Sequence, residues 1–181
     1  MQRNLNFMNK NDNIILIGMP GSGKSSIGVI LAKKLGMNFC DVDLVIQEHE
    51  GELLQKTVDR LGADAFIELE ADIVCSLDMK NSVIAPGGSA VLCQRGAEHL
   101  KKLGKIVYLK ISLECLKTHL KTLSSRGIAM KPGQTLDDIY AYRTPIYEKY
   151  ADITVDISNL SLSKSVSAVA DALKSADIRK D

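Results

Sequence analysis

The chain has 181 residues, a formal net charge of +1, 45% hydrophobic residues and 25% charged residues. A chain of this length is expected to form one domain, and its ordinary composition excludes a disordered or fibrous protein. The balanced charge gives no general attraction to polyanions, so we expect no nucleic-acid partner and no membrane partner. Four cysteines without a CxxC pair, no signal-peptide pattern and no long apolar run favour a cytoplasmic protein with reduced thiols.

The start of the chain predicts a polar tail, followed by a domain that opens with a strand and a helix. We expect a disordered polar tail over residues 1–13 and a single domain over residues 14–181. Residues 14–17 are a continuous apolar run, which is typical of a strand buried on both faces. Residues 25–35 carry apolar side chains at helical spacing and end at Gly36, a residue that favours the end of a helix.

The rest of the chain repeats this alternation of strand and helix. Short apolar runs at residues 82–85, 105–111 and 152–156 are separated by segments of helical length, and the last part of the chain predicts a closing amphipathic helix. The pattern predicts an α/β fold, a three-layer α/β/α sandwich with a central parallel sheet of about five strands. Residues 123–137 are polar, rich in Gly, Pro and Ser, and without apolar periodicity, so we expect a mobile lid there.

The strongest motif lies between the first strand and the first helix. Residues 18–25 read GMPGSGKS and fit the phosphate-binding pattern G-x-x-x-x-G-K-[ST]. Its backbone N–H groups would surround phosphate oxygens, Lys24 would reach the β- and γ-phosphates, and the Ser25 hydroxyl would bind Mg²⁺. We therefore predict binding of a nucleotide with Mg²⁺, and assign nucleotide binding to Gly21, Ser22, Gly23, Lys24, Ser25 and Ser26.

A pair of carboxylates follows at Asp41 and Asp43, at the end of a short apolar segment and just before a helical stretch. The i, i+2 spacing places both side chains on one side of an extended segment. Asp43 alone is also typical of a helix N-cap. Beside a phosphate loop, we interpret Asp41 as a residue that holds Mg²⁺ through water and Asp43 as the group that accepts the proton of an attacking hydroxyl.

Six segments taken together resemble the shikimate kinase family in order and spacing, over residues 14 to about 172. They are GMPGSGKSSIG at 18–28, FCDVD at 39–43, GADAFIELE at 62–70, VIAPGGSAV at 83–91, SSRGI at 124–128 and YRTPIYEKYADITVD at 142–156. The resemblance implies a P-loop kinase fold and ATP-dependent phosphorylation of the 3-hydroxyl of shikimate, a step of chorismate and aromatic amino acid biosynthesis. We expect a monomer that uses ATP, Mg²⁺ and a small hydroxylated acid.

The resemblance also implies roles for single residues. The catalytic residues would be Lys24, Asp43 and Arg126, the last of these reaching the transferring phosphates from the lid. Substrate binding would involve Asp43 together with Gly87, Gly88 and Arg143, where Arg143 holds the substrate carboxylate. Mg²⁺ would be held by Ser25 and Asp41, and His119 stands where the family has an arginine that stacks on adenine.

Three departures from the family pattern lie in or near the acceptor pocket. Ile67 replaces a second carboxylate-binding arginine, Ser89 ends the Gly-Gly-Gly signature and Gly127 follows the lid arginine. Loss of one charge-assisted contact would weaken shikimate binding by about 1.5 to 3 kcal/mol. Glu70 is expected to be exposed, and with Ile67 nearby it either lacks a partner or pairs with Arg143. A kinase for another small alcohol, such as a hydroxy amino acid or polyol, and an inactive nucleotide-binding module remain alternatives.

Overall fold

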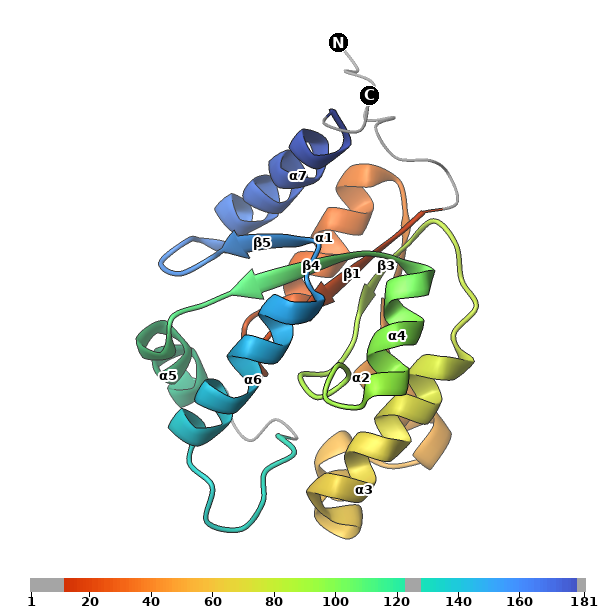
Figure 1. The fold of residues 1–181 in the computed structure, drawn as a ribbon, viewed down its shortest axis with the longest axis vertical. Coiled ribbons are helices and arrows are strands. Elements are labelled where there is room, and N and C mark those ends of the chain that lie inside the picture. The colour runs from red at the N-terminus through yellow and green to blue at the C-terminus, as the bar shows by residue number, and fades with distance from the viewer. Residues whose placement is uncertain (1–11, 123–127, 179–181) are drawn as a thin grey trace.

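The computed structural model describes residues 12–122 and 128–178. Five strands form one sheet in the order β2-β3-β1-β4-β5, with every neighbouring pair parallel (Figure 1). The strands are β1 (Asn13–Ile17), β2 (Asn38–Asp41), β3 (Ser82–Ala85), β4 (Gly104–Lys110) and β5 (Ile153–Asp156). The predicted parallel sheet is confirmed.

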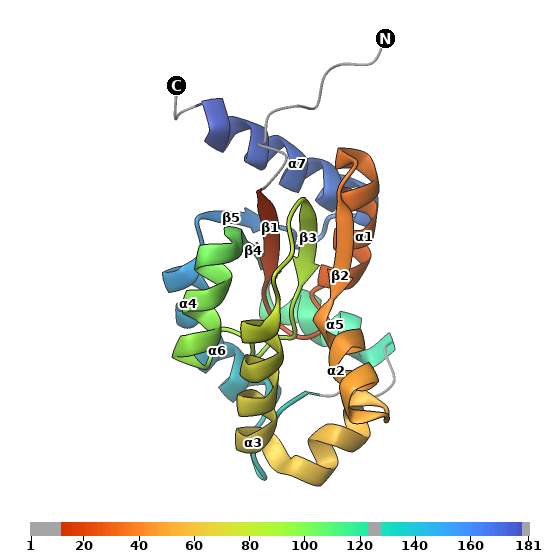
Figure 2. The same cartoon turned by 90° about the vertical axis from the view of Figure 1, so that its right-hand side faces the viewer.

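Helices cover both faces of the sheet. With the sheet seen nearly edge-on, α1 and α7 lie on one side and α4 and α6 on the other (Figure 2). The three-layer architecture predicted from the alternating pattern is thus confirmed. The helices of the described residues are α1 (Lys24–Leu35), α2 (Val42–Glu50), α3 (Leu54–Ser76), α4 (Gln94–Leu103), α5 (Leu113–Thr122), α6 (Leu136–Tyr150) and α7 (Leu162–Ile178).

Apolar strands at the centre of the sheet form the core. All residues of β1 and β3 are buried, as expected for strands with helices on both faces. Ile15 of β1 stands in register with Ile84 of β3 and Ile106 of β4, and none of the three is exposed. None of the helices among the described residues has the length and apolar character needed to cross a bilayer.

The first strand begins one residue earlier than predicted. Asn13, which we assigned to the tail, is a buried residue of β1. Its Nδ2 donates to the carbonyl oxygens of Met79 (2.6 Å) and Leu103 (3.0 Å), and its Oδ1 accepts from the N–H of Ser82 (3.0 Å). The Asn13 side chain therefore joins β1 to the start of β3 and to the residues that precede β3 and β4. The apolar pattern of the sequence could not indicate this role.

The predicted lid is only partly described. Residues 123–127 lie outside the described residues. The predicted lid extended to residue 137, but α6 already begins at Leu136, so the last two residues of the predicted lid are helical. Thr135 caps this helix: its side chain accepts from the N–H of Asp138, and the Asp138 carboxylate accepts from the N–H of Thr135.

The carboxyl ends of β1, β2 and β3 lie at the same edge of the sheet because the strands are parallel. The segments that leave these ends contain residues 18–23, Asp41 with Asp43, and residues 86–89. They are in close contact: a Cβ added to Gly88 would lie 2.6 Å from Pro20 Cδ, and one added to Gly87 would lie 2.9 Å from Asp43 Oδ1. Parallel α/β sheets bind ligands at this edge.

Candidate active site

The phosphate-loop motif forms a turn at the start of α1 whose geometry suits the binding of an anion. Gly23 precedes the helix with φ +92°, a left-handed conformation that glycine adopts without strain. No side chain caps this end of α1, and its first turn holds no acidic residue. The N–H groups at the helix start and its positive end are therefore directed at whatever occupies the loop.

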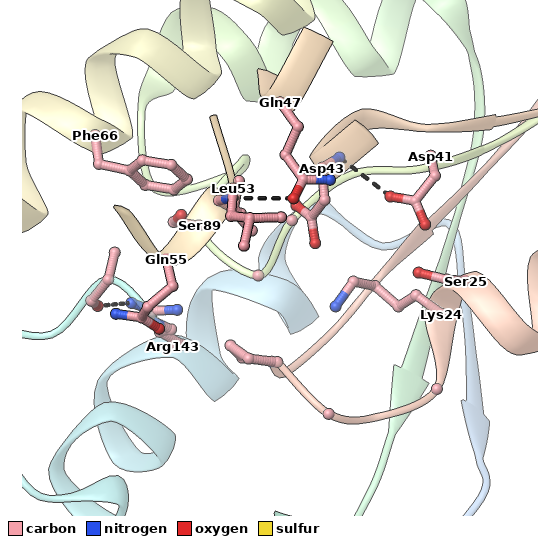
Figure 3. A pocket seen from close by; sticks show the side chains of 17 residues that line it. Lys24, Ser25, Asp41, Asp43, Gln47, Leu53, Gln55, Phe66, Ser89 and Arg143 are labelled. Atoms are coloured by element: carbon pink, nitrogen blue, oxygen red, sulfur yellow. Dashed lines mark hydrogen bonds between the residues drawn. The ribbon is translucent and has the colours of Figure 1, made fainter. Parts of the chain in front are cut away.

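Lys24 lies over this loop and is buried. Its Nζ donates to the carbonyl oxygens of Gly18 (3.0 Å) and Met19 (3.1 Å). Burial lowers the pKa of Lys24 to about 8, while the charges of Asp43, Glu70 and Asp41 act in the opposite direction. In the close view, the Lys24 amine and the Asp43 carboxylate point toward one another (Figure 3).

A cavity of about 500 Å³ brings most of the predicted site residues together. Ser25 and Asp41 lie at one end of it, and Arg143 with Phe66 lies at the other (Figure 3). We call these the phosphate end and the acceptor end. The predicted residues that line the cavity are Gly21, Gly23, Lys24, Ser25, Asp41, Asp43, Gly87, Gly88 and Arg143.

Four predicted residues are not part of this lining. Ser22 is buried within the loop, and Ser26 is exposed on α1. His119 is exposed on α5, the helix whose neighbouring residue Leu120 lies against Gly21 of the phosphate loop. Arg126 lies outside the described residues.

The two aspartates have different surroundings. Asp41 Oδ1 accepts a hydrogen bond from the N–H of Asp43 (3.1 Å), so Asp41 is the N-cap of α2. The capping role that we considered for Asp43 thus belongs to Asp41. The Asp43 carboxylate projects from the first turn of α2 into the cavity, next to Gly87 (Figure 3).

The donors available to a metal ion are few. Ser25 and Asp41 line the phosphate end of the cavity, and the described residues contain no group of three or more His, Cys, Asp or Glu side chains suited to a metal. Mg²⁺ is usually bound by one or two protein oxygens together with substrate phosphates and water. The two donors therefore suit Mg²⁺ that arrives with a nucleotide.

Arg143 is 3% exposed at the acceptor end. Its Nη2 donates to the carbonyl oxygen of Ala129 (2.6 Å), a residue of the predicted lid. A second cavity of about 760 Å³ shares Arg143 and Ala129 with the first. Ile67 lines this second cavity and not the first, so the apolar replacement lies in the cavity next to the acceptor end, which Arg143 also lines.

Glu70 is neither exposed nor paired with Arg143, and the alternative that it lacks a partner holds for only one of its two carboxylate oxygens. Its side chain is completely buried, and its Oε2 accepts a hydrogen bond from the Ser89 hydroxyl, whereas its Oε1 has no hydrogen-bond partner. Burial raises the pKa of Glu70 to about 7, although the bond from Ser89 acts to lower it. Two unusual features of the sequence, Ser89 and an unmatched Glu70, therefore contact each other.

Several lining residues were not predicted from sequence. Gln47 lies one turn after Asp43 on α2, and its Oε1 accepts from the N–H of Leu54 (3.1 Å). Phe66 and Ser89 belong to segments already singled out, so their position in a motif could have indicated them. Pro20 lies within the phosphate-loop motif and Ala129 within the predicted lid, whereas three other lining residues carry no motif that signals a site: Leu53, Leu54 and Gln55.

A glycine-rich loop before a helix, facing a carboxylate across a cavity at the carboxyl edge of a parallel sheet, defines a P-loop kinase for a small acceptor. The family model for shikimate kinase matches residues 20–174. The chain therefore belongs to the shikimate kinase family.

Individual relatives agree with this assignment. The shikimate kinase of Xanthomonas campestris is 33% identical over 157 residues, which cover 85% of this chain and 87% of the relative. That of Haemophilus influenzae is 34% identical over 165 residues, covering 89% and 92%. The solved structure of shikimate kinase from Acinetobacter baumannii in complex with shikimate matches with a TM-score of 0.74 at 26% identity, covering 94% of this chain and 95% of that one.

Proposed function

We propose that this protein transfers the γ-phosphoryl group of ATP to a hydroxyl group of shikimate. The observation that carries the proposal is the placement of Lys24 and Asp43 on facing sides of one cavity (Figure 3). One side chain suits the phosphates and the other suits an alcohol, so donor and acceptor can meet between them. Family membership and the relative with shikimate bound support the choice of acceptor.

At the phosphate end, the loop and α1 bind the triphosphate. Gly21, Ser22 and Gly23 offer backbone N–H groups, and Ser26 extends this set into the helix. Lys24 exchanges the carbonyl oxygens of Gly18 and Met19 for phosphate oxygens. Ser25 and Asp41 would hold Mg²⁺, which when bound neutralises charge on the β- and γ-phosphates.

At the acceptor end, Asp43 accepts the proton of the attacking hydroxyl and orients it toward the phosphate. Gly87 and Gly88 let the acceptor approach the backbone closely. Arg143 binds the acceptor carboxylate, for which its planar guanidinium is well suited. Its present bond to Ala129 uses only one of its N–H groups.

Two further roles complete the proposal. Arg126 stabilises charge on the transferring phosphoryl group, and closure of residues 123–137 over the cavity excludes water that would otherwise hydrolyse ATP. His119 stacks on adenine, a role supported by its position on α5 beside the phosphate loop. The comparisons do not favour the alternative of a different small alcohol as acceptor.

A coupled assay of ADP release with purified protein, ATP and Mg²⁺ tests this function. We expect release that depends on shikimate, with hydroxy amino acids and polyols giving rates close to the rate without acceptor. A higher rate with one of those alcohols, or release independent of any acceptor, contradicts the proposal.

Replacing Ile67→Arg provides a second test of the acceptor. If shikimate is the substrate, a guanidinium beside Arg143 adds a charge-assisted contact, and the KM for shikimate should fall about tenfold or more. A rise in that KM would contradict the choice of shikimate.

A further inference from the structure

The buried carboxyl of Glu70 has no role in the reaction outlined above. It lies in α3, is completely buried, and does not line the cavity. Burying a carboxyl group is unfavourable unless its oxygens are hydrogen-bonded, and only one of the two has a partner here. An apolar side chain would fill the same space without this penalty, so packing alone does not explain Glu70.

Glu70 lies against the loop of residues 87–89. A Cβ added to Gly87 would overlap with Glu70 Oε1. The Ser89 hydroxyl, which donates to Glu70 Oε2, belongs to a residue that is 3% exposed and lines the cavity. Residues 87–89 thus line the cavity and also contact the Glu70 carboxyl, whose Oε1 lies on the same side of Gly87 as Asp43 Oδ1.

The same loop is held from a second helix. The Tyr147 hydroxyl of α6 donates to the carbonyl oxygen of Gly88 (2.5 Å), and Tyr147 is 1% exposed. Gly88 also lies against Pro20 of the phosphate loop, and Gly87 lies against Asp43. A small shift of Gly87 would therefore alter its distance to the proposed base, Asp43.

We propose that Glu70 and Ser89 form a latch that fixes the Gly87–Gly88 backbone at the acceptor end of the cavity. On the proposed function, Glu70 is then a positioning residue: it acts on acceptor binding through Ser89 and does not touch the acceptor. Ser89 replaces a third glycine and supplies the hydroxyl that the latch requires, and Ile67, one turn before Glu70 on α3, offers that carboxylate no hydrogen bond.

Three variants and one matched control test the latch. Ser89→Ala removes the donor, Glu70→Met removes the acceptor at similar volume, and Glu70→Gln keeps a carbonyl oxygen for the Ser89 hydroxyl. Ser82→Ala is the control, because Ser82 is 2% exposed and its hydroxyl donates to the carbonyl oxygen of Lys80 (2.9 Å) at the opposite end of β3.

Two measurements apply to each variant. The first is steady-state kinetics for both substrates, and the second is hydrogen exchange of the loop without substrates. The amides of Ala90 and Leu92 donate to the carbonyl oxygens of Gly87 (3.4 Å) and Ser89 (2.9 Å), so they report opening of this loop.

We expect Ser89→Ala and Glu70→Met to raise the KM for shikimate about tenfold and to speed exchange at Ala90 and Leu92, with the KM for ATP changed less than about twofold. Glu70→Gln should restore most of the shikimate affinity. Ser82→Ala should change neither the KM for shikimate nor the exchange of the loop.

Unchanged exchange in Ser89→Ala and Glu70→Met overturns the latch, and so does an equal change in Ser82→Ala, because the effect would then be general destabilisation. Faster exchange without any change in the KM for shikimate overturns the positioning role. If the wild-type protein does not phosphorylate shikimate, the proposed function fails, and the exchange rates alone decide whether the latch exists.

Discussion

Several polar side chains in and beside this cavity are buried. Lys24 is an example, since its amine is held by the carbonyl oxygens of Gly18 and Met19 of its own loop. Replacing Lys24→Met keeps the length of the side chain and removes the charge. We expect turnover to fall at least about a thousandfold, because the transferring phosphoryl group loses its main cationic partner. Thermal unfolding should be unchanged or shifted slightly upward, and a variant with normal turnover would refute the assignment of Lys24.

Asp43 allows the two halves of the reaction to be separated. The Asp43→Asn variant cannot accept a proton, so phosphoryl transfer to shikimate should fall by about a hundredfold or more. ATP affinity should stay within about threefold, because the phosphate loop is unaltered. Rate measurements with isothermal titration of ATP check both values. Loss of nucleotide binding in this variant would show that the division of roles is wrong.

Glu70 leads to a prediction about stability and pH. The pKa of Glu70 is about 7, above its ordinary value of 4.5. Between pH 4.5 and pH 7, the Glu70 carboxyl therefore keeps its proton in the folded protein but loses it in the unfolded chain. The contribution of Glu70 to stability is therefore highest below pH 4.5 and is lost as pH rises through 7. Relative to Glu70→Gln, the wild-type free energy of unfolding should fall by about 3 kcal/mol between pH 4.5 and pH 8.

Denaturant unfolding of wild-type protein and Glu70→Gln at several pH values measures this difference. A difference that does not change with pH would show that the Glu70 carboxyl titrates at its ordinary pKa and is not held in an apolar environment.

Whole elements were easier to predict than their exposed and buried faces. Continuous apolar runs indicated β1, β3, β4 and β5, and helical spacing indicated α1 and α7, because period and burial are local properties of a sequence. The position of Glu70 could not be predicted in the same way. Its burial depends on the loop after β3, and a charged residue in a helix is normally exposed.

The contact between Gly88, in the loop after β3, and Pro20 of the phosphate loop gives a prediction about how these two loops are spaced. A Cβ on Gly88 would lie 2.6 Å from both Pro20 Cγ and Cδ, and 3.0 Å from Pro20 N. Gly88→Ala should therefore push the acceptor loop and the phosphate loop apart. We expect the KM values for ATP and for shikimate both to rise about fivefold or more, as for other small displacements of reacting groups. If only one of the two changes, Gly88 does not set the distance between the loops.

Across the whole molecule, the arrangement of motifs was predictable, whereas the contacts between them were not. The phosphate loop, Asp43 and Arg143 could be assigned because their motifs have fixed spacing. Gln47, Leu53 and Gln55 line the same cavity without any motif, and Ile67 lies in the neighbouring cavity. Such placements arise from packing of α2, α3 and α6 around the sheet edge, which a local pattern does not specify.

Asn13 connects β1 to the segments that lead into β3 and β4, at the end of the sheet opposite the active-site cavity. Replacing Asn13→Ala removes its hydrogen bonds to backbone groups of Met79, Leu103 and Ser82, of which the bond to Ser82 is buried and the other two are partly buried. We expect the free energy of unfolding to fall by about 2 to 4 kcal/mol, with KM values unchanged below the unfolding temperature. The neighbouring exposed residue provides the control, as Asp12→Ala should have little effect on stability. Equal stability of the two variants would contradict the linking role.

The central claim is that one cavity brings the γ-phosphoryl group of ATP to an alcohol of shikimate. The most direct measurement is transfer of labelled γ-phosphate from ATP, with the product identified by mass spectrometry, for wild-type protein and for Asp43→Asn. We predict that the wild-type protein forms singly phosphorylated shikimate in equal amount to ADP and that the variant forms almost none. ADP without phosphorylated shikimate, or equal product from the Asp43→Asn variant, would contradict the account.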